Sequence, residues 1–320
     1  MKVYIQDAEQ NRFDMEGLQL KNTSAALGTF DAMHVGHTAI IRRAVQDAKE
    51  NGRIPVVSLF LNLPANVVSH KNTEQIYTFE EKCRILEEIG VEVVLAERFT
   101  EAYMQKSYVD FFQEYLLNKL DAKFLSVGFN YHFGQGGQGD VKRLAALCEK
   151  HDITLYVQPC VQFEEVVSST HIRELLLAGE VDRAAKYLGR YFTLSGEVIH
   201  GNGQGHKFGF PTANMEIPSG LVPRFGVYIS QANIDGTWYP SVTNIGEKPT
   251  VKKNRKNVET HLLDFSGDLY GKEITVRFIK FIRGIQKFQG IDELIAQVER
   301  DKKSGYEFFA GTQMEMKKCF

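Results

Sequence analysis

The first half of the chain alternates between two hydrophobic patterns, and this alternation constrains the fold more than any other feature. Short apolar, often β-branched runs occupy residues 25–27, 55–60, 91–95, 124–127 and 153–157. Helical patterns lie between them, at residues 38–51, 78–89, 108–117 and 141–151. Strands separated by helices form right-handed crossovers and a mostly parallel sheet. The sequence therefore predicts an α/β domain whose ligands bind beyond the carboxyl ends of the strands.

The pattern changes after Gly189. Two helical patterns, at residues 168–179 and 181–188, precede short β-rich runs at residues 192–199, 226–233, 238–245, 258–264 and 274–282. Gly, Asn, Asp and Pro separate these runs, which is typical of a small antiparallel barrel. One more helix, at about residues 291–303, follows the barrel. We place the boundary near residues 185–190, which predicts domains at residues 1–187 and 188–320.

Composition and charge exclude several classes of protein. A length of 320 residues suits two domains. A net charge of −2 argues against a protein that binds nucleic acid by neutralising phosphates. The sequence contains no run of 18 apolar residues, so we expect no membrane span. The N-terminus also lacks the apolar core of a signal peptide. The four cysteines form no CxxC pair, so we expect a cytoplasmic protein with reduced thiols and small-molecule partners.

One segment, Gly28 to His37, lies where an apolar run turns into a helical pattern. The first N–H groups and the dipole of that helix favour an anion in the turn. His34 and His37 are three residues apart and can face one ligand, and Gly36 lets a phosphate approach the backbone. The segment therefore predicts a site for nucleotide phosphates. An ordinary strand–helix connection and a two-histidine metal site are the alternatives, although zinc would need further ligands.

The sequence Gly-Thr-Phe-Asp-Ala-Met-His-Val-Gly-His resembles the HxGH signature of nucleotidyltransferases, in the GxFDxxHxGH form of bacterial FAD synthetases. This resemblance implies a Rossmann-like nucleotidyltransferase domain in which five residues of the segment bind the nucleotide: Gly28, Phe30, His34, Gly36 and His37. Residues 168–173 resemble the SSTxIR motif of the same family. The resemblance implies that its hydroxyls and guanidinium contact the triphosphate at a helix N-terminus: Ser168, Ser169, Thr170 and Arg173. By themselves, the hydroxyls could equally be a helix cap.

A second segment, residues 201–214, is rich in glycine but matches neither a P-loop nor the Rossmann fingerprint. Thr212 and Asn214 are two apart on an extended segment and so point to one side. Their oxygens suit Mg²⁺ held beside substrate phosphates. Glu259, in a strand-like run, could take a proton from an attacking hydroxyl. The alternative is that Glu259 is a carboxylate on the solvent side of a strand.

The sequences GFPTAN and VETHLLDF, followed by Leu-Tyr-Gly and Phe-Ile-Arg, resemble riboflavin kinases over about residues 190–305. The resemblance implies that Thr212 and Asn214 hold Mg²⁺ and ATP. It also implies that Glu259 is the catalytic base that activates the 5′-hydroxyl of the ribityl chain. Lys207 stands where the family's glycine loop commonly has arginine, so it and Gly205 are expected nucleotide contacts.

The two resemblances together give the layout of the bifunctional bacterial riboflavin kinase/FAD synthetases. They imply that the kinase converts riboflavin to FMN, and that the first domain joins FMN to AMP from ATP, giving FAD. The implied flavin contacts are Asn62, Asn130 and Arg283.

Three residues depart from the family pattern: Leu63 stands for a histidine, Asn130 for an aspartate and His171 for an arginine. Because charge-assisted contacts are missing, we expect FAD synthesis to be slower than FMN synthesis. Two alternatives remain: a riboflavin kinase with a degenerate adenylyltransferase domain, and a regulatory protein that senses flavin or nucleotide.

Overall fold

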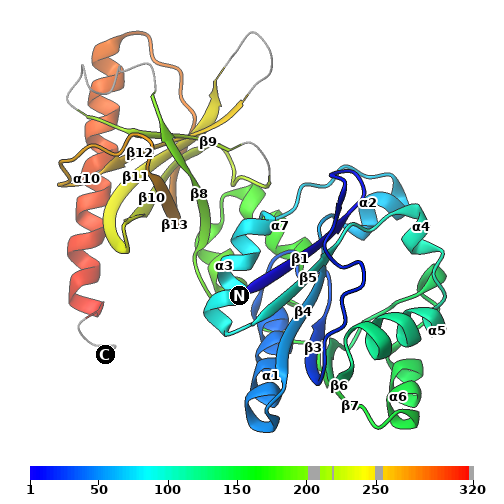
Figure 1. The fold of residues 1–320 in the computed structure, drawn as a ribbon. Coiled ribbons are helices and arrows are strands. Elements are labelled where there is room, and N and C mark those ends of the chain that lie inside the picture. Colours follow the sequence, from blue (N-terminus) through cyan, green and yellow to red (C-terminus); the bar gives the residue numbers. More distant parts are fainter. Residues whose placement is uncertain (201–209, 218–219, 249–254, 317–320) are drawn as a thin grey trace. The chain divides into compact units, whose positions relative to one another are not determined.

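The computed structural model describes residues 1–200, 210–217, 220–248 and 255–316 (Figure 1). The chain divides into two compact units, Met1–Ser169 and Thr170–Phe320. Each unit has its own sheet and core, and each is described by itself.

The first unit is built on a seven-stranded sheet in the order β2-β1-β5-β4-β3-β6-β7. All neighbouring strands are parallel except the pair β1 and β2, so the predicted parallel sheet is confirmed. The strands are β1 (Lys2–Asp7), β2 (Arg12–Phe13), β3 (Thr23–Leu27), β4 (Ile54–Phe60), β5 (Val93–Glu97), β6 (Ala122–Gly128) and β7 (Thr154–Gln158).

Helices follow the strands, as the alternating pattern predicts. They are α1 (Val35–Asn51), α2 (Pro64–Ser69), α3 (Phe79–Ile89), α4 (Glu101–Met104), α5 (Tyr108–Asp110) and α6 (Val141–Lys150). A π-helix, Phe111–Lys119, continues α5, and a 3₁₀ turn lies at Gln135–Gly137. Thr78 begins α3 with a reciprocal capping box to Glu81, which satisfies two backbone N–H groups at the helix start.

The centre of the sheet is a topological switch point. Strand β3 pairs with β4 on one side and with β6 on the other. The loops that leave the carboxyl ends of β3 and β6 therefore diverge and open a crevice between them. The segment from Gly28 to His37 follows β3, and Asn130 follows β6, so both lie at this edge.

The second unit begins with two helices, α7 (Ser169–Ala178) and α8 (Val181–Leu188). A closed six-stranded barrel follows, in the order β10-β11-β12-β9-β8-β13 with antiparallel neighbours, so the predicted barrel is confirmed. Its strands are β8 (Phe192–Ile199), β9 (Ala213–Ile217), β10 (Gly226–Ile234), β11 (Thr237–Lys248), β12 (Arg255–Leu262) and β13 (Glu273–Gly284).

The unit boundary falls at the first residue of α7, because the rest of that helix and α8 pack with the barrel. The backbone N–H of Arg224 donates to the carbonyl of Leu176 at 3.0 Å, and a side chain at Gly179 would lie 3.3 Å from the Phe281 ring. The functional boundary that we placed at 187/188 stays a prediction.

A row of hydrogen-bonded, buried hydroxyls identifies the inner face of the barrel wall. The Ser230 hydroxyl lies 2.7 Å from that of Thr243, which lies 3.0 Å from that of Thr260. All three side chains are buried. Because side chains alternate along a strand, Glu259 on β12 lies on the outer face.

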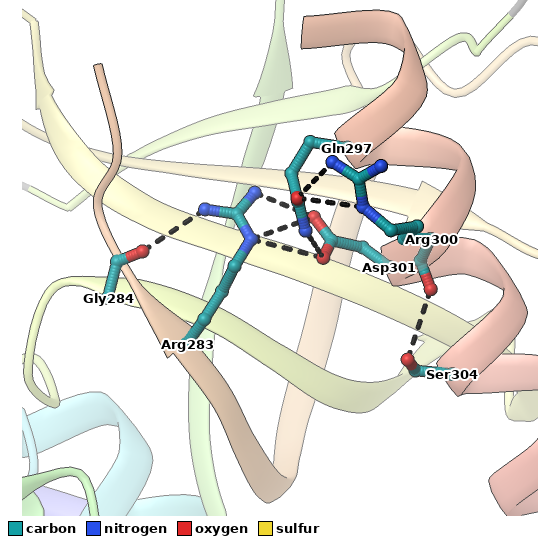
Figure 2. Close-up of polar contacts among 6 residues, drawn as sticks. All are labelled: Arg283, Gly284, Gln297, Arg300, Asp301 and Ser304. Atoms are coloured by element: carbon teal, nitrogen blue, oxygen red, sulfur yellow. Dashed lines mark hydrogen bonds and ion pairs between the residues drawn. The ribbon is translucent and has the colours of Figure 1, made fainter. Parts of the chain in front are cut away.

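A long helix, α10 (Ile291–Met316), packs against the barrel and extends beyond the predicted residue 303. Figure 2 shows the contact that ties it to β13: the guanidinium of Arg283 meets the carboxylate of Asp301, with Nη2 and Oδ2 2.6 Å apart. Gln297 donates to the same carboxylate at 2.9 Å. At Gly305 a Cβ would lie 2.9 Å from a methyl of Val242, so glycine permits the close approach of helix and barrel.

Candidate active sites

The first site is the start of α1. Phe30 and Met33 both have left-handed backbone angles, with φ of +48° and +46°. This conformation is uncommon for residues other than glycine and is found most often at functional sites. His34 is the N-cap of the helix, and its Nδ1 accepts the backbone N–H of His37 at 3.1 Å. Nδ1 is therefore the unprotonated nitrogen of the His34 ring.

Two glycines allow the rings of this segment to pack. A Cβ at Gly28 would lie 2.8 Å from the Phe30 ring, and one at Gly36 would lie 3.2 Å from the His34 ring. The His34 ring stacks on the His37 ring with their centroids 3.6 Å apart. Gly36 therefore leaves room for the histidine stack, and its role at a phosphate stays a prediction.

His37 lies in an environment that disfavours a positive charge on its ring and favours an anion beside it. Burial lowers the pKa of its imidazole well below 6.5, and the neighbouring His34 and Lys82 lower it further. Its Nδ1 is buried and has no hydrogen-bond partner within the described parts of the chain. A buried ring nitrogen without a partner is costly, and a ligand phosphate or its proton can supply the missing bond.

Of these residues, Gly28, Phe30 and His37 line a cavity of about 620 Å³ at the switch point, together with Asn130 after β6. Its wall includes an aromatic cluster that the sequence did not indicate: Phe60 lies 5.1 Å from Phe99 and 5.3 Å from Tyr103 between ring centroids. Such a cluster suits the apolar face of a planar ring system. Its members follow the ends of β4 and β5, where the fold places ligand contacts.

Asn62, an expected flavin contact, is engaged with the protein. Its Nδ2 donates to the carbonyl of Phe99 at 2.9 Å, and its Oδ1 accepts the Phe99 N–H at 2.8 Å. The amide thereby holds the loops after β4 and β5 together and positions the Phe99 ring in the cavity. Leu63, where the family resemblance leads us to expect a histidine, is buried at the start of α2.

The SSTxIR motif begins α7, and the division between the units falls inside it. Ser168 and Ser169 belong to the first unit, while Thr170 and Arg173 belong to the second, so their role at a triphosphate stays a prediction. His171 packs its ring edge against Tyr187, with centroids 4.9 Å apart.

The second site lies on the outer face of β9, β12 and β11. The strand register places Glu259 opposite Asn214 on one side and Asn244 on the other. In the next row, Asn257 lies between Glu216 and Gly246. Side chains two residues apart on a strand share a face. The register therefore joins the two predicted segments, which lie far apart in the sequence.

Thr212 and Asn214 contact each other directly. The Asn214 Nδ2 donates to the Thr212 carbonyl at 3.1 Å and lies 3.4 Å from its hydroxyl. Thr212 also lines a cavity of about 390 Å³ with the loop at residues 265–270. Across from it, Nδ1 of His261 lies 2.9 Å from the carbonyl oxygen of Pro211, which ties β12 to this segment. Burial lowers the pKa of His261.

No cluster of three or more His, Cys, Asp or Glu able to hold a metal occurs in the part of the chain that the structure describes. Among the described residues, His34 and His37 have no third ligand of these types beside them. A hydroxyl and an amide fit Mg²⁺ when the nucleotide's phosphates and water complete its oxygen shell.

Glu259 has a neighbour that the sequence did not single out. Nδ2 of Asn257 donates to its Oε1 at 2.9 Å. The spacing of two residues on one strand could have indicated this pair, although many such pairs only share a solvent-facing surface. Arg283 uses its guanidinium on Asp301 and on the carbonyl of Gly284, as Figure 2 shows. Gly205 and Lys207 lie outside the described residues.

Comparison with known proteins finds two family models on the chain: FAD synthetase at residues 18–171 and riboflavin kinase at residues 188–309. A bifunctional riboflavin kinase/FMN adenylyltransferase of Listeria monocytogenes is 33% identical, over 90% of this chain and 93% of its own. The Escherichia coli K12 enzyme of that name is 35% identical, over 90% and 93%.

The crystal structure of a macrolide-efflux protein from Streptococcus pneumoniae matches with a TM-score of 0.82 and 26% identity, covering 96% of this chain and 99% of that one. In this chain, no helix among the described residues is long and apolar enough to cross a membrane. These matches extend over both the parallel-sheet unit and the barrel unit of this chain. The chain belongs to the family of bifunctional riboflavin kinase/FMN adenylyltransferases.

Proposed function

We propose that the chain phosphorylates riboflavin to FMN in its barrel unit and adenylylates FMN to FAD in its parallel-sheet unit. The observation that carries this proposal is the presence of two separate sites, each in the unit that the corresponding family model matches. Two whole domains and bifunctional relatives favour this function over a kinase with a degenerate first domain and over a flavin-sensing regulator. ATP as the shared substrate suits a cytoplasmic location.

In the kinase reaction, Glu259 accepts the proton of the ribityl 5′-hydroxyl as its oxygen attacks the γ-phosphorus of ATP. The bond to the β-phosphate oxygen breaks and ADP leaves. Thr212 and Asn214 hold Mg²⁺ together with the nucleotide's phosphates. The ion supplies charge neutralisation on those phosphates when it is bound.

In the adenylyl transfer, an oxygen of the FMN phosphate attacks the α-phosphorus of ATP in line, and pyrophosphate leaves. The side chains act by positioning and by stabilising charge. His34 and His37 at the start of α1 hold the phosphates, with Gly28 and Gly36 permitting the close approach. Phe60, Phe99 and Tyr103 offer the flavin ring an apolar wall.

One incubation tests the proposal against both alternatives. The whole chain is mixed with riboflavin, ATP and Mg²⁺, and the flavins are separated by chromatography. FMN and FAD together support the proposal. FMN alone means that the first domain is degenerate, and the absence of both products means that the chain is a regulator.

A further inference from the structure

Asn257 is a buried amide beside the kinase base. Its side chain is 4% exposed, although β12 presents it on the outer face of the barrel, in the row next to Glu259. Its Nδ2 donates to Oε1 of Glu259 at 2.9 Å. A hydrogen bond from a neutral donor to a carboxylate is stronger than one between neutral groups and fixes the plane of the carboxylate.

The other end of the amide is unsatisfied. Oδ1 of Asn257 is buried and has no hydrogen-bond partner among the described residues. A buried acceptor left in this way costs about 1–3 kcal/mol. Rotating the amide by half a turn would place Oδ1 against the carboxylate of Glu259, so two acceptors would face each other. The observed orientation is therefore the one that serves Glu259.

The surroundings explain why a neutral donor stands here. Glu216, on the neighbouring strand β9, lies opposite Asn257, and Glu259 lies two residues further along β12. A carboxylate at position 257 would place three acids together, while an apolar residue would leave Oε1 of Glu259 without this donor. An amide supplies the N–H and adds no charge.

We propose that Asn257 is a positioning residue of the kinase site: its N–H bond sets the carboxylate of Glu259 in the orientation that receives the proton of the substrate's primary alcohol. This proposal rests on the proposed role of Glu259 as the base. In this proposal Asn257 acts through Glu259 rather than on the substrate, and an oxygen without a partner among the described residues is the cost of the orientation.

The first test is a split between rate and binding in the full-length protein. Asn257→Ala should lower kcat for FMN formation by about 10- to 100-fold, the range expected for misplacing a reacting group by up to about an ångström. KM for riboflavin and for Mg²⁺·ATP should change by less than about twofold. Adenylylation of supplied FMN should be unchanged, which shows that the parallel-sheet unit is intact, while the unchanged KM values show that the barrel unit is folded.

Two comparison variants separate positioning from packing. Ser195→Ala removes a polar group elsewhere in the barrel, a hydroxyl that lies 2.9 Å from that of Thr275 between β8 and β13. This variant should leave kcat unchanged. Asn257→Asp keeps the shape of the side chain but replaces the donor by a negative charge, so it should lower kcat more than Asn257→Ala. If Asn257 only filled space, both variants would keep kcat, and the melting temperature would fall instead, more for Asn257→Ala than for Asn257→Asp.

A double-mutant cycle decides whether Asn257 acts through Glu259. In the Glu259→Gln background, Asn257→Ala should cost less than about twofold in kcat, because the group that it positions is already gone. An equal loss in both backgrounds, or an unchanged kcat for Asn257→Ala in the wild type, overturns the proposal. If Glu259→Gln itself retains kinase turnover, the assignment of the base fails instead, so the two failures are distinguishable.

Discussion

The ion pair between Arg283 and Asp301 allows a quantitative test of how α10 is held to the barrel. The side chains are 16% and 6% exposed and meet through two parallel contacts, Nη2 to Oδ2 at 2.6 Å and Nε to Oδ1 at 3.1 Å (Figure 2). Asp301→Ala removes one partner and leaves the guanidinium largely buried. Breaking a buried pair in this way costs about 3–5 kcal/mol.

At about 3 kcal/mol, a unit of this size should lose roughly 6–12 °C in the melting temperature of its transition. Differential scanning calorimetry of the full-length chain measures this change. The matched control is Glu307→Gln, which breaks an exposed pair with Lys303, where the two charged atoms are 3.8 Å apart. Exposed pairs contribute about 0.2–1 kcal/mol, so the control should shift the transition by no more than about 2–4 °C.

The double variant Arg283→Met with Asp301→Leu tests the cause of the loss. Replacing a whole buried pair by apolar side chains is often neutral, so the double variant should recover most of the melting temperature. A shift below about 2 °C for Asp301→Ala, or a double variant as unstable as the single one, would refute the reasoning. The single variant Arg283→Met, added to this set, tests the flavin role of Arg283: a direct contact makes it raise KM for riboflavin far more than Asp301→Ala does.

Four further outcomes are expected. Glu259→Gln should lower FMN formation by about 10²-fold or more without changing adenylylation of supplied FMN, and near wild-type turnover would exclude the role of base. Thr212→Ala should raise the Mg²⁺ and ATP concentrations that the kinase needs; calorimetry that shows unchanged Mg²⁺–nucleotide affinity, with unchanged kinetics, would contradict this. The pKa of His37 is lowered by burial from 6.5, so below that pH the unfolded chain takes up a proton that the folded chain does not, and stability falls as the pH falls. His37→Asn should reduce that acid sensitivity in calorimetric scans and abolish FAD formation, and an unchanged pH dependence would count against a buried neutral imidazole. FAD formation should be slower than FMN formation, and Asn130→Asp with His171→Arg should raise it; equal rates in the unmodified protein would show that these two substitutions are harmless.

Hydrophobic periodicity was enough to predict the central strands of the sheet and the barrel, because those strands bury whole faces. Strand β1 was missed: Lys2–Asp7 mixes charged and apolar residues, and its place at the sheet comes from pairing with β5. The π-helical turns at Phe111–Lys119 were also missed, since buried side chains there fit a helical pattern of either period. Tertiary pairing, which a local pattern does not contain, decided the case of β1.

The site residues show the same limit at the level of single side chains. His34 and His37 could be selected because a strand-to-helix turn identifies a place where ligands bind. The partner of Asn62 could not be predicted, because a polar side chain after a strand can equally bind a ligand or form hydrogen bonds with the backbone of a neighbouring loop. In the structure it bonds both polar groups of Phe99. The contact of Asn257 with Glu259 could not be predicted either, because it depends on the orientation of the Glu259 side chain, which the sequence does not specify.

Two residues at the sites differ from Asn62 and Arg283 in how their buried polar atoms are satisfied. Asn62 and Arg283 spend their polar atoms on the protein, and each fixes a neighbouring element. His37 and Asn257 each keep a buried atom without a partner among the described residues, although such atoms are costly. Folding alone would favour replacing them by apolar side chains. Their retention beside the two sites is explained if a phosphate supplies the missing partner of His37, and if the orientation of Glu259 requires the amide of Asn257.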